Sequence, residues 1–385
     1  MKRIIIIALF ITSLVFTGCT DKREVDDLII ATAIALDLNE EGSLELSIQI
    51  LNVHSVGNRP MDAAPVVVIA ETGRTVQEVL RKISTIIPEK LFFSHFVLLV
   101  IGEELAREGI LPYVTFFAIN QDALHRFNIA VARGCKGKDV LKIVSVAAHV
   151  PSMSAEGKLL ETSKYYGIGK YYTNDEVLSD IRSEGISLSL GSIQIIGDPE
   201  KGSDLENRKK TDLEAYTKAS TIAVFKKDKL IDWMDEEESL GYNYISGKIK
   251  NSYIVVTKGD GTFASVQVMK VNSKTKPILE NGKIKFKISI SFLAEITEDL
   301  SGETSHDNAY VRDILERTNY EIRLLCEKAI QKAQTIKADI FGFGRLLYRK
   351  KYKLWLEIKD RFEEEIFPEL ETEIVVQGKI TRVKP

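Results

Sequence analysis

The sequence contains few cysteines: three in 385 residues, at Cys19, Cys135 and Cys326. So small a number excludes a fold held together by a framework of disulfides. Cys135 and Cys326 could form a single disulfide outside the cell, but we expect two buried free thiols instead. Cys19 differs from both, because it directly follows an apolar N-terminal segment.

Histidines and catalytic motifs are equally scarce. The five histidines show no pair at the spacing that places two zinc ligands on one helix face. The chain has no Gly-x-Ser-x-Gly elbow and no phosphate-binding Gly-x-x-x-x-Gly-Lys-Ser/Thr loop, and its lone Gly-x-Gly pairs are typical of turns. We therefore predict that the protein is not an enzyme and has no catalytic residues, metal site or cofactor.

Neither sign of charge dominates, since 52 basic and 55 acidic residues give a formal net charge of −3. We identify no run of lysine or arginine that could act as a footprint for nucleic acid or anionic lipid, and we predict no nucleic-acid partner. The acidic run Asp235–Glu238 could bind a cation. Four adjacent carboxylates in a regular element do not converge on one ion, however, so we interpret the run as a solvated loop.

The N-terminus carries the clearest signal in the sequence. Two basic residues precede the largely apolar segment 4–16, whose thirteen residues suit a signal peptide and are too few to span a bilayer. Thr17 and Gly18 are small, as a signal peptidase requires, and Leu-Val-Phe-Thr-Gly-Cys is typical of a bacterial lipobox. We predict that residues 1–18 form a lipoprotein signal peptide and that Cys19 carries a diacylglycerol anchor, in preference to a plain secretory signal or a transmembrane anchor.

Residues 19–197 alternate irregularly between strand and helix patterns, which predicts a mixed α/β region that we expect to contain two subdomains. The expected strands are 28–38, 44–53, 63–72, 96–101, 127–132 and 187–197. A helix is expected over 75–87, where Thr75 and Glu78 suit a capping box, and one or two short helices broken by Pro112 are expected over 102–118.

The polar stretch 198–216 predicts a linker, and residues 217–385 predict an α+β domain in which strands precede helices. A long helix is expected over 309–338, ended by Gly342–Gly344 and followed by a shorter helix around Trp355. The expected strands are 221–225, 230–234, 252–257, 263–271, 284–296 and 371–383. The fold class is thus a multi-domain mixed α/β or α+β protein, with mixed and antiparallel sheets packed with helices and a long C-terminal helix.

Several of these residues resemble the Ger(x)C lipoprotein family, the C subunits of bacterial spore germinant receptors. The most specific match is Asp339-Ile-Phe-Gly-Phe-Gly344, with Trp355 eleven residues later. The other matching segments are, in chain order, Asp21–Leu28, Phe93-Ser94-His95, Gly102–Arg107, Ala223–Lys226 and Glu238–Tyr242. Thr20 and Phe362 stand where the family often has tryptophan, and an Arg-Asp pair common in the family is absent near residues 120–122.

The resemblance implies a lipid-anchored subunit that works with A and B membrane subunits on the outer face of the spore inner membrane to sense nutrients and start germination. It implies no catalytic residues, and it leaves open whether this subunit binds nutrient directly. A solute-binding lipoprotein that delivers a ligand to a transporter is the alternative, although two similar βαβ lobes would then be expected.

Candidate contact or structural residues follow from the same matches. Phe341 and Phe343 alternate with Gly342 and Gly344, which could let a partner backbone come close. The alternative is a left-handed helix stop with two core phenylalanines. The further candidates are Ser94, His95, Asp339 and Trp355.

Overall fold

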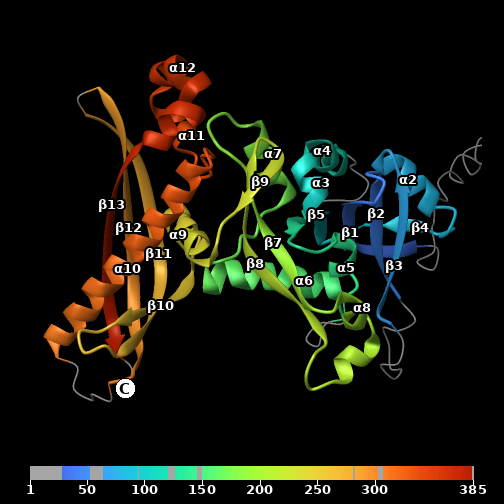
Figure 1. The fold of residues 1–385 in the computed structure, drawn as a ribbon, viewed down its shortest axis with the longest axis horizontal. Coiled ribbons are helices and arrows are strands. Elements are labelled where there is room, and N and C mark those ends of the chain that lie inside the picture. The colour runs from blue at the N-terminus through green and yellow to red at the C-terminus, as the bar shows by residue number, and fades with distance from the viewer. Residues whose placement is uncertain are drawn as a thin grey trace, which may run out of the picture.

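The computed structural model describes residues 28–52, 64–93, 95–119, 126–144, 150–280, 282–301 and 307–383. It contains two β-sheets that lie toward opposite ends of the long axis of the molecule, with helices packed on both (Figure 1). Cys19, Ser94 and the predicted signal peptide lie outside the described residues. The predicted mixed α and β class, including a long C-terminal helix, is confirmed.

The first sheet has nine strands in the order β3-β2-β1-β5-β6-β7-β8-β9, with β4 paired to the start of β1. Strands β1, β5, β6 and β7 run parallel, and antiparallel strands flank them on both sides. The strands are β1 Leu28–Leu38, β2 Leu44–Leu51, β3 Val66–Gly73, β4 Lys90–Phe92, β5 Leu98–Gly102, β6 Asn128–Ala132, β7 Ser189–Gly197, β8 Ala215–Lys226 and β9 Lys229–Trp233.

Both faces of this sheet are buried, because its central strands are apolar on each side. In β1, Ile34 and Leu36 enter one core while Ala33 and Ala35 enter the other. Helices α2, α3, α4 and α7 contribute to the first core, and α5 and α6 contribute to the second. These helices are α2 Val76–Ile83, α3 Glu103–Glu108, α4 Leu111–Ile119, α5 Gly137–Val140, α6 Pro151–Glu161 and α7 Asn174–Arg182.

The break between α3 and α4 corrects one expectation. It falls at Gly109, which has φ 132°, and Pro112 lies in the first turn of α4 rather than between helices. A proline is tolerated there because the first amides of a helix have no intrahelical acceptor to lose.

The first sheet continues beyond the expected linker. Residues 198–214 hold the short helix α8 (Pro199–Gly202) and a 3₁₀ turn over Leu205–Lys209, after which β8 returns to pair antiparallel with β7. The chain leaves this sheet only after β9, through helix α9 (Glu236–Ser246). The division of the chain into domains at 198–216 stays a prediction.

The acidic run 235–238 forms the start of α9 and not the solvated loop that we expected. Asp235 is the N-cap, and its side chain accepts a hydrogen bond from the Glu238 amide while the Glu238 carboxylate accepts one from the Asp235 amide. Carboxylates are favoured at this end of a helix because they face unpaired amides and the positive end of the helix dipole.

The second sheet has four strands in the order β10-β11-β12-β13, all antiparallel except the parallel pair β12–β13. The long helix α10, with α11 and α12, provides the crossover that a parallel pair requires. The elements are β10 Asn251–Thr257, β11 Phe263–Glu280, β12 Lys283–Asp299, α10 Asn308–Thr335, α11 Phe343–Lys350, α12 Tyr352–Arg361 and β13 Glu371–Val383.

Helix α9 crosses α10 at a glycine. A Cβ added to Gly241 would lie 2.0 Å from the Leu325 carbonyl oxygen of α10, so only glycine permits this approach. We expect Gly241→Ala to lower the free energy of unfolding by about 1–3 kcal/mol through overpacking. Gly157 of α6 is the matched control because a Cβ there meets nothing within 4 Å. Gly157→Ala should instead stabilise by about 0.5–1 kcal/mol. Urea unfolding measures both, and equal effects would contradict the crossing.

Candidate functional site

The candidate motif 339–344 spans the end of the α10–α11 connection and the first two residues of α11, and it packs against the loop 183–188 that precedes β7. The Ser187 amide donates to the Asp339 carbonyl oxygen at 2.9 Å, and the Arg345 amide donates to the Gly185 carbonyl oxygen at 2.6 Å. These two backbone bonds join the first-sheet half of the chain to the helices of the second. We call this contact the glycine junction.

Two glycines let the backbones meet. A Cβ added to Gly185 would lie 2.4 Å from the Gly344 carbonyl carbon, and one added to Gly344 would lie 2.8 Å from the Gly185 Cα. Gly342 has a left-handed backbone with φ 72°, and it is the residue that precedes α11. The expectation that residues 342–344 end the long helix is wrong, because α10 already ends at Thr335.

Polar side chains surround the glycine junction. Arg345 donates to Asp180 Oδ1 at 2.7 Å, while Tyr172 donates to the other oxygen of the same carboxylate. The Trp355 indole donates to Glu184 Oε2 at 3.0 Å. The Arg345–Asp180 and Trp355–Glu184 bonds join the two sides of the junction. The bond from Tyr172 supports the Asp180 carboxylate from its own side.

The aromatic residues of the motif lie in the core of the second half. Phe343 is 1% exposed and stacks on Phe286 of β12, with ring centres 4.5 Å apart. Phe341 lies 5.4 Å from Phe343, and Trp355 packs edge-on against Phe362 at 5.4 Å. The motif residues therefore make intramolecular contacts, and their proposed role in binding another protein stays a prediction.

Asp339 is the chemically unusual group in the motif. Its Oδ2 accepts from the Gly344 amide at 2.8 Å, whereas the buried Oδ1 has no hydrogen-bond partner within the described part of the chain. Burial, aided by the nearby Glu363 carboxylate, raises the pKa of Asp339 to about 7. The carboxyl thus changes charge close to neutral pH.

A cleft of about 300 Å³ opens beside the glycine junction, between the loop 183–188 and α12. Its polar lining mixes both signs of charge: Glu184, Lys227, Lys359, Asp360 and Glu363. No group of histidine, cysteine, aspartate and glutamate that could hold a metal ion occurs among the described residues. No helix in those ranges is long and apolar enough to cross a membrane.

A second polar contact between the halves centres on Lys170, which is only 2% exposed. Its ammonium donates to Ser189 Oγ of β7 at 2.8 Å and to the Tyr242 hydroxyl of α9 at 3.0 Å, and it lies 3.7 Å from the centre of the Tyr172 ring. Burial alone would raise the pKa of Tyr242, but the adjacent cation outweighs it and the pKa lies below its ordinary value. Two hydroxyls and an aromatic face thus stabilise this buried charge.

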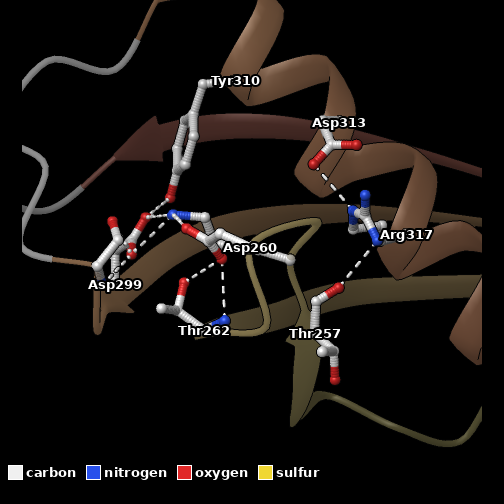
Figure 2. A network of polar contacts seen from close by, with 9 residues as sticks. Thr257, Asp260, Thr262, Asp299, Tyr310, Asp313 and Arg317 are labelled. Carbon is white, nitrogen blue, oxygen red and sulfur yellow. Dashed lines mark hydrogen bonds and ion pairs between the residues drawn. The ribbon is translucent and has the colours of Figure 1, made fainter.

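Figure 2 shows a third polar network, at the end of the second sheet. The Asp299 carboxylate accepts from Tyr310 and from Lys258, whose ammonium is 3.2 Å from both carboxylate oxygens (Figure 2). Burial would raise the Asp299 pKa, but these bonds and those from Ser301 hold it well below its ordinary value. Arg317 of α10 also donates to the Thr257 carbonyl oxygen at 2.9 Å. The network fastens the turn after β10 to α10.

The remaining candidates lie elsewhere. His95 is exposed, in a turn before β5, and not in the core; its neighbour Phe96 packs in the core of the first sheet. Cys326 is a buried free thiol as expected, while Cys135 is free but only half-buried. Sequence reasoning missed Gly185, Ser187 and Arg345, because the loop 183–188 carries no motif and gains its role only by contact.

Two protein families match consecutive parts of the chain. The family described as spore germination protein N-terminal domain matches residues 21–195, and the family described as spore germination B3/GerAC like, C-terminal, matches residues 220–384. The chain belongs to this spore germination GerAC-like family, and it carries both family domains in order.

Named relatives span almost the full length of the chain. Spore germination protein KC of Bacillus subtilis (strain 168) is 29% identical over 99% of this chain and 96% of its own. Spore germination protein A3 of the same organism is 23% identical, covering 96% of this chain and 95% of its own. The crystal structure of the GerBC protein matches with a TM-score of 0.54 and 17% identity, covering 90% of this chain and 96% of that one, and shows a shared fold.

The glycine junction predicts a large cost for a methyl group at Gly185. Gly185 and Gly282 have similar left-handed backbones, φ 73° and 78°, but a Cβ at Gly282 meets nothing within 4 Å. Gly282→Ala should cost about 1 kcal/mol of unfolding free energy from backbone strain alone. Gly185→Ala should cost about 3 kcal/mol or more, because the backbones at Gly185 and Gly344 must also move apart to make room for the methyl group. Similar urea midpoints for the two variants would show that the backbones do not touch.

Asp339 predicts a specific pH dependence. An unfolded chain loses this proton near pH 4, while the folded protein keeps it to about pH 7. The carboxyl therefore stabilises the fold fully below about pH 4, and its contribution is lost as the pH rises through about 7. Asp339→Asn should remove that loss and raise the unfolding free energy at about pH 8, relative to its effect at about pH 4, by on the order of 4 kcal/mol. The matched control is Asp360→Asn, which removes an exposed carboxylate from the lining of the same cleft. An Asp339→Asn profile with the same pH dependence as that of the unmodified protein would contradict the buried carboxyl.

Proposed function

We propose that the protein is the lipid-anchored C subunit of a nutrient germinant receptor, acting as a non-catalytic interaction subunit. It would work beside the A and B membrane subunits on the outer face of the spore inner membrane. The observation that carries the proposal is the presence of both family domains in order, the first starting at residue 21, two residues after Cys19.

The tether gives the subunit its place. Anchoring in a bilayer is stable when two acyl chains or two signals act together, and a diacylglycerol on Cys19 supplies two chains. Attachment confines the body to the membrane surface and raises its effective concentration toward membrane partners. A weak protein–protein contact would then be sufficient for assembly.

The body gives the subunit its mechanical role. The backbone bonds of the glycine junction and the buried Lys170 contacts join the two halves of the chain. A partner that binds one half would thereby act on the other, without chemistry at either.

The tether is tested by isolating the protein from detergent-solubilised spore membranes. We expect intact protein to recover a multi-spanning and an A-type membrane protein, and Cys19→Ala to recover much less of both because the anchor is lost. Cys135→Ala is the control, since it removes a cysteine outside the lipobox and should recover both in full. Recovery of ATP-driven importer components instead would contradict the receptor and favour a solute-binding lipoprotein.

A further inference from the structure

Six consecutive residues, 348–353, are exposed where α11 ends and α12 begins. Four of them are cations, Arg349, Lys350, Lys351 and Lys353, and the whole segment 343–356 contains no acidic residue. This corrects the expectation that the chain has no basic run able to form a footprint. The run is short in sequence, but the helix boundary leaves every one of its side chains in solvent.

Apolar side chains are exposed within the same segment. Tyr348, Tyr352 and Leu356 are 43%, 53% and 47% exposed, and the two tyrosine rings meet edge-on with centres 5.5 Å apart. Tyrosine beside lysine and arginine, with an exposed leucine, is the composition of surfaces that lie at the boundary of a bilayer. We name residues 348–353 together with Leu356 the basic–aromatic face.

The cations of this face form no ion pairs among the described residues, unlike those of a similar run earlier in the chain. At 208–210 the sequence is also Arg-Lys-Lys, but Lys209 pairs with Glu206 and Lys210 with Glu214, both at 2.7 Å. Across the described ranges, none of the four cations of the basic–aromatic face has an ion pair with a carboxylate. Their charge is therefore available to an external anionic surface.

More positive charge lies at the same end of the molecule. The tip of the β11–β12 hairpin extends toward the end that carries α12 (Figure 1). Lys274, Lys276 and Lys283 are exposed near this tip, as is Leu279 at 55%. Lys276 stands directly opposite Lys287 in the register, and Lys287 pairs with Glu373 of β13 at 2.6 Å.

We propose that the basic–aromatic face binds the anionic lipid surface of the membrane to which the chain is tethered. The proposal rests on the tether of the proposed function. Without its leader the chain has a formal net charge of −5, so most of its surface is repelled by anionic lipid and this face is selected. Exposed tyrosine and leucine beside the cations favour a lipid boundary, whose apolar interior takes up such side chains while its headgroups take up the charge.

The position of the face gives the contact a purpose. Strand β1, which follows the N-terminal segment, and helix α12 lie toward opposite ends of the long axis (Figure 1). A lipid anchor alone leaves the body free to swing, whereas a second contact in the other half of the molecule restricts its orientation relative to the bilayer. Each cation near an anionic surface strengthens binding by about fivefold, so the face is too weak to anchor the protein by itself but sufficient to orient a tethered one.

The test uses full-length lipidated protein in vesicles of phosphatidylcholine alone or of phosphatidylcholine and phosphatidylglycerol in equal parts. An environment-sensitive fluorophore is attached at Leu356→Cys or, as the reference site, at the exposed Tyr216→Cys of β8. Burial raises the pKa of Cys135 to about 12 and also raises that of Cys326, so the introduced thiol reacts selectively at neutral pH. We expect a blue shift at position 356 only, in phosphatidylglycerol vesicles only, and its loss at high salt.

Matched lysine variants assign the shift to the face. K350Q/K351Q/K353Q should weaken docking by roughly a hundredfold and abolish the shift. K201Q/K209Q/K210Q removes three exposed lysines that pair with Glu206 or Glu214, and it should leave the shift intact. Equal urea midpoints for both variants confirm that neither is misfolded.

Two outcomes would overturn the proposal, and they are distinguishable. Protein retained on both vesicle types, with the same emission at position 356 in each, contradicts the basic–aromatic face and leaves the tether intact; an acidic protein or nucleic acid would then be the occupant. Protein that binds neither vesicle contradicts the tether, and with it this proposal.

Discussion

The close approach of two glycine backbones, Gly185 and Gly344, is the constraint on which the arrangement of the two halves depends. It lets Arg345 donate its amide to the Gly185 carbonyl oxygen, and it brings Arg345 to Asp180 and Trp355 to Glu184. A single methyl group at either glycine would separate these pairs, because backbone atoms, unlike side chains, have no alternative rotamer. The junction therefore involves few residues, but its backbone contacts leave little freedom for the two halves to move relative to each other.

Buried polar groups stabilise other parts of the body, and they differ in how fully they are hydrogen-bonded. Lys170 has two hydroxyls and an aromatic ring around its ammonium, and Asp299 is held as a carboxylate by several donors. Asp339 is different, since one oxygen lacks a partner within the described ranges and burial raises its pKa. The two satisfied networks fix the geometry around them, while the junction contains a carboxyl whose pKa is raised to about 7 by burial.

Two attachments of different kinds fit this body. A diacylated cysteine would hold the protein at the membrane without regard to orientation, and the basic–aromatic face in the other half would set the orientation without being able to hold the protein. The junction would link the two mechanically, because it joins the first-sheet half to the half that carries α11 and α12. As the proposed subunit, the protein would present a fixed surface to membrane partners.

The sequence by itself determined the elements whose signal is local. The strand Glu371–Val383 was predicted with its observed bounds, and the helix expected over 309–338 is found as Asn308–Thr335, because periodicity of two or 3.6 marks one buried face. The cap at Thr75 and the candidate motif at 339–344 were also visible in the sequence. Only the tertiary structure decided that β8 and β9 belong to the first sheet, since pairing with β7 across a polar stretch leaves no periodic signal. It also decided that Gly185 faces Gly344, because that contact joins residues more than a hundred positions apart in the sequence. The tertiary structure likewise decided that the cations at 349–353 stay unpaired, because pairing depends on which carboxylates lie near them.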